Sequence, residues 1–448
     1  MIAPRKTFLV LALLDAASVF VVFNVVSLLR NLTAGSVIVS ALMLPYLILG
    51  FAIYLIDGYR SRTDMLSLDY TSQHIIAILS AMVATVLLTF AVIPGGYELQ
   101  SSRIVVALSY LVLIPVTLGY RRLICQKAER MRESRSIVFI GDDASYRAFS
   151  AECKRLHMIQ SVVHAAMTPT GSDAVPFRQI IDDAVSGKLP LEAIVLRETA
   201  SELNSEVSRK LVEFYFNGLP TFTLELFHEV YWRKIPLYRV NQTWLFQEGF
   251  PIAREPVFER LKRAADIALA SVGIALTAPI ILLSILAVWL EDGRPVFFKQ
   301  HRIGRNQVPF VVRKIRSMRV GSEKSDLYTR PDDKRVTRVG RFLRATRIDE
   351  FPQLWNVLRG DMSLIGPRAE WDRLVENYQR EIPCYHFRHL VKPGITGWAQ
   401  INYPYGANLE DTLRKLEYDL YYIRHFSFRL DAQIMLKTIH VMLFGKGQ

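Results

Sequence analysis

Four apolar stretches fill most of the first 120 residues and constrain the fold more than any other feature of the chain. They cover residues 8–29, 34–56, 75–93 and 104–120. Their lengths suit a helix that crosses the hydrocarbon core of a bilayer, which takes roughly 17–25 residues. The sequence therefore predicts a four-helix transmembrane domain over residues 1–135 and excludes a wholly soluble protein.

Basic residues gather before the first stretch, between the second and third, and after the fourth. They are Arg5, Lys6, Arg60, Arg62, Arg121, Arg122, Lys127 and Arg130. Because lysine and arginine favour the cytoplasmic side of a membrane, both ends of the four-helix domain are predicted to be cytoplasmic. Asp15, the single charged residue within the stretches, has two readings. A polar contact between helices or near the membrane interface is favoured over a functional intramembrane site.

A fifth apolar run, residues 267–290, has Pro279 at its centre. Proline removes a helix hydrogen bond and clashes with the preceding turn, so a sharp kink or break is predicted there. Lys262 and Arg263 precede the run and a basic block follows it. These flanks favour a re-entrant segment that enters and leaves by the cytoplasmic face. A proline-kinked spanning helix is the alternative.

Residues 136–250 are predicted to form a Rossmann-like α/β domain, because short apolar runs typical of buried strands alternate there with helical patterns. The runs are Ser136–Gly141, Ser161–Met167, Ala193–Glu198 and Thr221–Phe227. The first ends in Gly141-Asp142-Asp143, which lacks the second and third glycines of a dinucleotide-binding turn. A structural or regulatory role is favoured, and nucleotide binding is the alternative.

The positive charge of the chain is concentrated in one block. The formal net charge is +13, and residues 299–347 carry 15 Lys and Arg against 4 Asp and Glu. Such a block suits phosphate groups on a nucleotide substrate, on lipid headgroups or on nucleic acid. The three cysteines exclude a disulfide scaffold. One lies in the run Cys384–His389, which offers three metal ligands without a fitting fourth, so a packing role is favoured over metal binding.

An adjacent acid pair, Asp349-Glu350, directly follows the basic block. A carboxylate can attack a phosphoryl group and form an acyl phosphate, provided that Mg²⁺ or arginine neutralises the phosphate charge. The nearby cations are Arg338, Arg341, Arg344, Arg347 and Arg368. Taken alone the pair is weak evidence, because most such pairs lie on solvated helix faces.

The motifs around this pair are similar to those of the bacterial sugar transferase family, the polyprenyl-phosphate hexose-1-phosphate transferases or monotopic phosphoglycosyl transferases. The resemblance covers about residues 254–448. In chain order the motifs are Lys262–Asp266, Pro295–Gln300 followed by Arg302 and Gly304, Lys314–Met318, Arg338–Arg344, Thr346–Arg368 and Lys392–Gln400. The four apolar stretches and the α/β domain resemble the large members of the family. Two motifs depart from its pattern, because Ala278 replaces a common serine before Pro279 and Ala369 replaces a proline after Arg368.

The resemblance implies a mixed α/β catalytic domain over residues 251–448 with a re-entrant membrane helix at residues 267–290. It implies transfer of a hexose-1-phosphate from a UDP-sugar to undecaprenyl phosphate, with release of UMP. This would be the first membrane step of exopolysaccharide, capsule or O-antigen synthesis. The active site would face the cytoplasm at the bacterial inner membrane, in contact with bilayer lipids, and large family members suggest a homodimer.

The resemblance also implies roles for individual residues. Asp349 would be the nucleophile that forms a covalent phosphosugar intermediate and would bind Mg²⁺, with Glu350 as general base or metal helper. The expected phosphate-binding residues are Arg368, Arg338, Arg341, Arg344, Lys314 and Arg316. The expected membrane-interface residues are Lys262, Arg263, Asp266 and Pro279.

Two other functions stay open at the level of sequence. One is a membrane glycosyltransferase that moves a bare sugar and releases UDP, and the other is a non-enzymatic membrane sensor. Nucleic acid is not an expected partner, because the sequence carries no helix-turn-helix, zinc-finger or RNA-binding signature.

Overall fold

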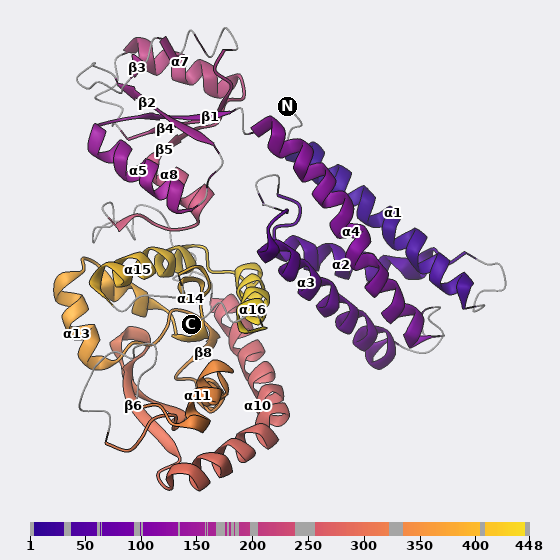
Figure 1. Ribbon diagram of the computed structural model, residues 1–448, viewed down its shortest axis with the longest axis vertical. Helices are drawn as coiled ribbons and strands as arrows, with labels where there is room; N and C mark the ends of the chain where they lie inside the picture. Colours follow the sequence, from indigo (N-terminus) through magenta and orange to yellow (C-terminus); the bar gives the residue numbers. More distant parts are fainter. Residues whose placement is uncertain are drawn as a thin grey trace. The chain divides into compact units, whose positions relative to one another are not determined.

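The computed structural model describes most of the chain (Figure 1). It covers residues 4–443 apart from 31–36, 61–62, 64, 94–98, 100–101, 133–134, 157, 159, 167–174, 177–178, 181–182, 184–187, 198–204, 238–255, 322–334 and 404–407. Contacts divide the chain into two compact units, residues 1–13, 60–71 and 115–233 in one and residues 14–59, 72–114 and 234–448 in the other. The predicted boundary between the middle and last domains, at residue 250, lies outside the described residues.

The N-terminal helices are α1 (Pro4–Leu29), α2 (Met43–Leu55), α3 (Leu68–Leu87) and α4 (Arg103–Arg132). Among the described residues, four helical segments are long and apolar enough to cross a membrane: Thr7–Leu29, Tyr70–Val92, Arg103–Lys127 and Val257–Asp292. Four apolar helices therefore lie before residue 135, and the described helix of the second stretch is shorter than the stretch itself. Residues 37–39 are not helical, so the apolar helix there is limited to Ser40–Leu55.

Asp15 lies in a buried polar contact. Its side chain is fully buried, and its Oδ2 accepts a hydrogen bond from the hydroxyl of Tyr59 at 2.5 Å. The contact joins α1 to the turn that follows α2, which agrees with the favoured reading of Asp15 as a structural polar contact.

The middle domain contains a five-stranded parallel sheet with strand order β3-β2-β1-β4-β5. Its elements are β1 (Ser136–Ile140), α5 (Asp143–Arg155), β2 (Ser161–Ala166), β3 (Val175–Pro176), β4 (Leu191–Leu196), α7 (Ser205–Phe216), β5 (Thr221–Thr223) and α8 (Leu224–Phe227). Helices α5 and α8 cover one face and α7 the other (Figure 1). Strand β1 is buried along its whole length because both faces are covered. The expected strand at 221–227 ends early, since residues 224–227 are helical.

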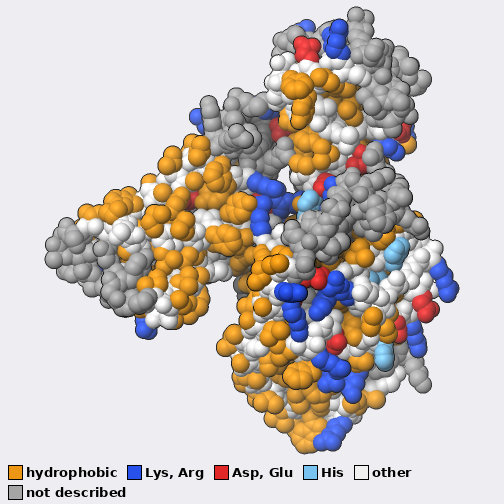
Figure 2. Space-filling model, turned by 180° about the vertical axis from the view of Figure 1, so that it is seen from behind, with side chains coloured by type: hydrophobic (Ala, Val, Ile, Leu, Met, Phe, Trp, Pro, Cys, Tyr) orange, Lys and Arg blue, Asp and Glu red, His pale blue; other side chains and the backbone are white. Residues whose placement is uncertain are grey.

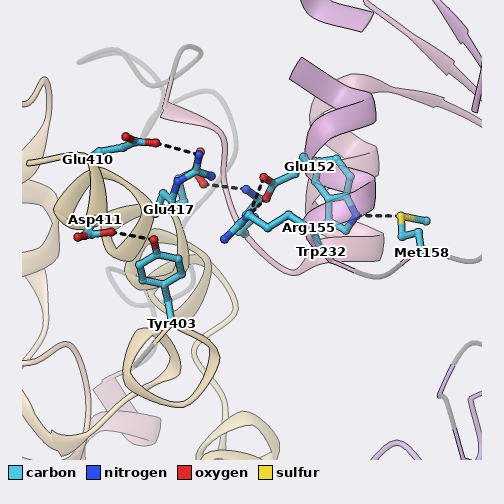
Figure 3. A network of polar contacts seen from close by, with 10 residues as sticks. Glu152, Arg155, Met158, Trp232, Tyr403, Glu410, Asp411 and Glu417 are labelled. Carbon is cyan, nitrogen blue, oxygen red and sulfur yellow. Dashed lines mark hydrogen bonds and ion pairs between the residues drawn. The ribbon is translucent and has the colours of Figure 1, made fainter. Parts of the chain in front are cut away.

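The turn after β1 favours the structural reading of this domain. Asp142 caps α5, because its carboxylate accepts from the backbone N–H and the hydroxyl of Ser145, each at 2.8 Å. A Cβ on Gly141 would lie 2.6 Å from the Cβ of Arg197. The N-terminus of α5, where a dinucleotide would place its pyrophosphate, therefore already holds a carboxylate. At the other end of the domain, Trp232 points toward Met158 and donates from Nε1 to its sulfur at 3.3 Å (Figure 3).

The last domain combines a long membrane-type helix with small sheets and short helices. Its elements are α10 (Pro256–Asp292), β6 (Phe297–Ile303), β7 (Pro309–Ile315), α11 (Arg338–Ala345), the 3₁₀ turn η9 (Ile348–Glu350), α12 (Gln353–Arg359), β8 (Ser363–Ile365), α13 (Asp372–Glu381), the 3₁₀ turn η10 (Tyr385–Leu390), β9 (Gly394–Thr396), α14 (Trp398–Asn402), α15 (Leu409–Arg424) and α16 (Phe428–Leu443). Its main core gathers buried side chains of α13, η10, α14, α15 and α16 around Trp398.

Helix α15 crosses this core and is fixed at its start by a capping box. Asn408 accepts from the backbone N–H of Asp411, whose carboxylate accepts in return from the Asn408 N–H. The same carboxylate accepts from the hydroxyl of Tyr403 at 2.8 Å (Figure 3). Further along α15, Glu417 forms an ion pair with Lys234 at 2.9 Å. These contacts set the position of α15, whose next turns reach the candidate site.

Helix α10 is bent rather than straight, as Figure 1 shows. Pro279 lies inside it, and hydroxyls on both sides of the proline bond back to carbonyls one turn earlier. Thr277 donates to the Gly273 carbonyl and Ser284 to the Ile280 carbonyl, each at 2.7 Å. Its outer side chains are apolar and uncovered, and Figure 2 shows them gathered over the surface where α10 lies. An apolar surface of this kind suits lipid rather than water.

Candidate active site

The antiparallel hairpin β6–β7 forms one wall of the site. Its register pairs Phe298 with Lys314 and Arg302 with Phe310. Residues opposite one another in an antiparallel pair project from the same face, so Lys314 and Arg302 share one face of the hairpin. Val312, between them on that face, is buried in a small core with Ala270 of α10 and Val357 of α12. The hairpin therefore directs a lysine and an arginine inward, toward the acid pair.

The acid pair lies on η9, between α11 and α12. Arg347 precedes it in the left-handed conformation with φ 58°, and this reverses the chain so that Asp349 is buried, with 7% exposed. Glu350 Oε1 accepts from Lys314 Nζ at 2.6 Å. The same oxygen lies 4.0 Å from a guanidinium nitrogen of Arg368. No described residue forms a hydrogen bond with the carboxylate of Asp349, so this group remains available to a ligand.

The two carboxyls have opposite ionisation behaviour. Burial raises the pKa of Asp349 to about 6, despite the opposing effect of Lys314. Burial alone would also raise the pKa of Glu350, but Lys314 and Arg368 outweigh it and hold that pKa well below its usual range. Glu350 is therefore the fixed anion of the pair. Ionised Asp349 is destabilised by burial, and a carboxyl with a raised pKa of this kind is typical of a reactive group.

Arg368 owes its position to a close approach of two loops. Gly366 N–H donates to the Thr396 carbonyl and Gly394 N–H to the Pro367 carbonyl, each at 2.9 Å. A Cβ on Gly397 would lie 2.1 Å from the carbonyl oxygen of Gly366, so a side chain there would push the loops apart. The glycines of both motifs thus allow the backbone contact that sets Arg368 beside Glu350.

The other predicted phosphate-binding residues lie at different distances from the pair. Arg344 is close enough to lower the pKa of Asp349, whereas Arg338 and Arg341 are exposed on α11. Arg316 is buried and donates to the carbonyls of Asp292 and Gly293 at 2.8 and 3.0 Å. Of the six predicted residues, the structure therefore brings Lys314, Arg344 and Arg368 to the acid pair, and Arg316 to the end of α10.

The predicted interface residues of α10 attach that helix to its own domain. Lys262 forms an ion pair with Asp431 of α16 at 2.5 Å. Arg263 donates to the carbonyls of Val357 and Leu358 at the C-terminal end of α12. Asp266 accepts from the backbone N–H of Leu364 at 3.1 Å.

Three charged residues that sequence reasoning did not assign to the site extend it on the far side of Arg368. Arg302 donates to the Ala369 carbonyl at 2.6 Å, and Arg388 donates to the Arg368 carbonyl at 3.0 Å. The third, Glu370, lies beside Arg388 at 3.9 Å. Two signals were available for Arg302: it follows the family-like motif Pro295–Gln300, and it alternates onto the same side of the hairpin as Lys314. Arg388 belongs to the Cys384–His389 run, so the arginine of that run reaches the site while burial lowers the pKa of His389 to about 3.

The donor set fits a magnesium ion that is shared with a substrate. Among the described residues no group of three or more His, Cys, Asp or Glu side chains is placed to hold a metal. Mg²⁺ at phosphate sites takes one or two carboxylates and completes its shell with water and phosphate oxygens. Asp349, whose carboxylate makes no hydrogen bond to the described residues, is the side chain that fits this role.

The site combines buried carboxylates with converging arginines and a lysine, and it adjoins an apolar membrane-type helix. This combination suits a protein that handles phosphate groups at a membrane. Residues 257–445 match the family described as Bacterial sugar transferase. A relative from Caulobacter vibrioides, a UDP-glucose:undecaprenyl-phosphate glucose-1-phosphate transferase, is 40% identical over 45% of this chain and 77% of its own length. The chain belongs to the bacterial sugar transferase family.

Two longer relatives extend the comparison. The UDP-N-acetylgalactosamine-undecaprenyl-phosphate N-acetylgalactosaminephosphotransferase of Aeromonas hydrophila is 37% identical over 60% of this chain and 63% of its own length. The UDP-glucose:undecaprenyl-phosphate glucose-1-phosphate transferase of Escherichia coli (strain K12) is 36% identical over 58% of this chain and 56% of its own length. This chain therefore spans less than two thirds of either protein.

Proposed function

We propose that the chain transfers a hexose-1-phosphate from a UDP-sugar to undecaprenyl phosphate and releases UMP. The observation that carries the proposal is the state of Asp349. It is buried, its pKa is raised to about 6, and no described residue bonds its carboxylate, while Glu350 beside it is held as an anion by Lys314. The names of the three relatives, which act on UDP-sugars and undecaprenyl phosphate, support the same reaction.

The proposed reaction has two steps. A carboxylate oxygen of Asp349 attacks the β-phosphorus of the UDP-sugar, and the bond from that phosphorus to the bridging oxygen breaks, so UMP leaves with the electron pair. A phosphate oxygen of undecaprenyl phosphate then attacks the same phosphorus and releases Asp349. Lys314, Arg344 and Arg368 offset the phosphate charge through both steps. Mg²⁺, when bound at Asp349 with the diphosphate, would supply further charge neutralisation.

The site suits these substrates because it is built on a helix that lipid can surround. We propose that α10 enters and leaves the membrane by the cytoplasmic face. A straight helix of 37 residues would span about 55 Å. Yet Arg263, near its start, bonds the end of α12, and Glu291, near its end, accepts from the N–H groups of Arg338 and Val339 at the start of α11. Attachment of both ends to one domain supports a bent, re-entrant path.

The reaction is tested by its nucleotide product. Purified full-length protein in lipid nanodiscs is incubated with undecaprenyl phosphate, Mg²⁺ and, in turn, UDP-glucose and UDP-N-acetylgalactosamine. UMP release that depends on both substrates supports the proposal. Release of UDP would instead identify a glycosyltransferase that moves a bare sugar. If neither UDP-sugar gave a nucleotide product, the result would favour a binding or sensor protein over an enzyme.

The re-entrant path predicts a labelling pattern. Single cysteines placed at the exposed positions Lys299 and Arg313, after α10, are expected to resist an impermeant thiol reagent in intact cells and to react after permeabilisation. The measurement is mass-tag labelling in a background from which the native cysteines are removed. Strong labelling of both positions from outside would mean that α10 spans the bilayer.

The raised pKa of Asp349 predicts the acid limb of the pH profile. A carboxyl whose pKa lies near 6 is mostly neutral below that pH, and the neutral form is a poor nucleophile. kcat/KM is therefore expected to fall about tenfold per pH unit below about pH 6. Initial rates across the pH range, with circular dichroism to verify that the fold survives, measure this limb. A flat profile down to about pH 5 would contradict the assignment.

A further inference from the structure

Glu370 is a carboxylate that the described part of the chain does not use. Its backbone carbonyl accepts from the Ile303 N–H at 3.1 Å, and this joins its segment to β6. Its side chain is 24% exposed, and no described residue donates a hydrogen bond to its carboxylate. A carboxylate can accept about four hydrogen bonds, and at this exposure the oxygens of Glu370 are accessible to a ligand.

The surrounding cations do not satisfy it. Arg388 is the nearest, with a guanidinium nitrogen 3.9 Å from Glu370 Oε1, which is beyond hydrogen-bond distance. Its donors are directed elsewhere, to Asp419 Oδ2 at 2.8 Å, to the Arg368 carbonyl at 3.0 Å and to the Tyr385 hydroxyl. Arg388 therefore compensates the charge of Glu370 and fixes its neighbours while leaving the carboxylate oxygens open.

Glu370 remains an anion in this setting. Burial alone would raise its pKa, but Arg388, Arg368 and Arg302 outweigh burial and hold the pKa below its usual range. An ionised carboxylate is an acceptor and not a donor, so a neutral ligand group that binds it is a hydroxyl or an amide N–H. A phosphate is excluded as its partner, because two anions repel one another.

Glu370 lies close in sequence to the arginine that approaches the acid pair. It follows Arg368 by two residues, and Arg368 approaches Glu350, the neighbour of Asp349. Arg302 is close enough to both Glu350 and Glu370 for each to raise its pKa. A molecule whose diphosphate lies against Arg368 and Asp349 would therefore carry its neighbouring hydroxyl groups toward Glu370.

We infer that Glu370 binds the nucleotide-sugar substrate by accepting hydrogen bonds from a pair of its hydroxyl groups. The inference rests on the proposed function and names a substrate contact within that site. Two adjacent hydroxyls of a sugar ring match the two oxygens of a carboxylate, which gives a bidentate contact with direction as well as strength. Both the ribose and the hexose of a UDP-sugar offer such a pair.

The experiment measures binding directly. Isothermal titration calorimetry of the full-length protein in nanodiscs compares wild type, Glu370→Gln, Glu370→Asp and the control Glu376→Gln, which alters an exposed glutamate on α13. UDP-glucose, UDP-N-acetylgalactosamine and UDP are the probes. The Kd of a UDP-sugar is expected to rise about tenfold or more in both Glu370 variants, because glutamine removes the charged acceptor and aspartate withdraws it from the ligand. The Kd of Glu376→Gln is expected to match that of wild type.

Glu370→Asp separates recognition from charge balance. It keeps the negative charge between the arginines but withdraws the oxygens by one methylene. If Glu370 only balances charge, the aspartate variant binds like wild type, and this outcome overturns the inference. A Kd for UDP that rises in parallel assigns the contact to the ribose, whereas an unchanged Kd for UDP assigns it to the hexose; both support the inference. Thermal unfolding of each variant verifies that the protein tested is folded.

The outcomes also separate this inference from the reaction. Wild type that binds UDP-sugars but releases no UMP overturns the proposed function, while the comparison of variants still decides the role of Glu370. Wild type that binds none of the probes overturns both. Wild type that binds and turns over its substrate, with Kd unchanged in both Glu370 variants, overturns the inference alone.

Discussion

Asp349→Asn is expected to release no UMP and to form no covalent adduct. With a UDP-sugar and Mg²⁺ but without lipid, wild type should release at most one UMP per active site and gain the mass of a hexose phosphate. The amide has nearly the same shape as the carboxylate but is a far weaker nucleophile, so turnover should fall by about 10⁴-fold or more. Intact-protein mass spectrometry and a UMP assay measure both effects.

The fold of this variant should be intact. Because burial raises the pKa of Asp349, the ionised carboxylate opposes folding near neutral pH, and a neutral amide removes that cost. Tm is therefore expected to stay level or to rise. Asp372→Asn, at the start of α13, is the matched control and should keep both adduct and turnover. Wild type that shows no added mass would instead mean that the lipid phosphate attacks directly, with Asp349 in another role.

Lys314→Met is expected to reduce kcat/KM by about a hundredfold or more. Glu350 would lose the charged hydrogen bond at 2.6 Å that keeps it ionised. Breaking a buried pair leaves an uncompensated charge, which costs about 3–5 kcal/mol unless the group takes up a proton. Two adjacent carboxyls would then compete for that proton, and the positive charge beside the substrate phosphates would be lost.

The pH profile distinguishes this role from a general loss of stability. Lys314 lowers the pKa of both Asp349 and Glu350, so its removal should move the acid limb of kcat/KM to higher pH. Lys299→Met is the matched control, because Lys299 is exposed and pairs with Arg313 on the other face of the same hairpin. An acid limb that stays in place in Lys314→Met would show that Lys314 does not set the ionisation of the pair.

Local patterns predicted those parts of the fold that depend on neighbours in sequence. The apolar runs predicted the helices α1 to α4, and the short apolar runs between helical patterns predicted β1, β2 and β4 of the parallel sheet. The local patterns failed where one apolar run contains two kinds of secondary structure. Residues 221–227 divide into β5 and α8, because Thr223 caps the helix by accepting from the Leu226 N–H. In the second apolar stretch residues 37–39 are not helical, and the described helical part begins at Ser40.

The candidate site was also predictable only where its residues are neighbours in sequence. Asp349 and Glu350 form a local motif, and resemblance assigns them a role that stays a prediction. The partner of Glu350 was not readable, because Lys314 reaches it across 36 residues through the hairpin register. Glu370 and Arg388 were missed because their meeting depends on η10 folding back against the loop after β8. Contacts between residues this far apart in sequence depend on the tertiary structure and cannot be predicted from local patterns.

The attachment of α10 sets a limit on how this domain can be engineered. A soluble version for crystallography or inhibitor screening would normally be made by deleting the membrane helix. Here the deletion would remove Glu291, which satisfies two N–H groups at the start of α11, and Arg263, which satisfies carbonyls at the end of α12. Both helices flank the turn that carries Asp349. A water-soluble version must therefore keep α10 and replace its outward apolar side chains with polar ones.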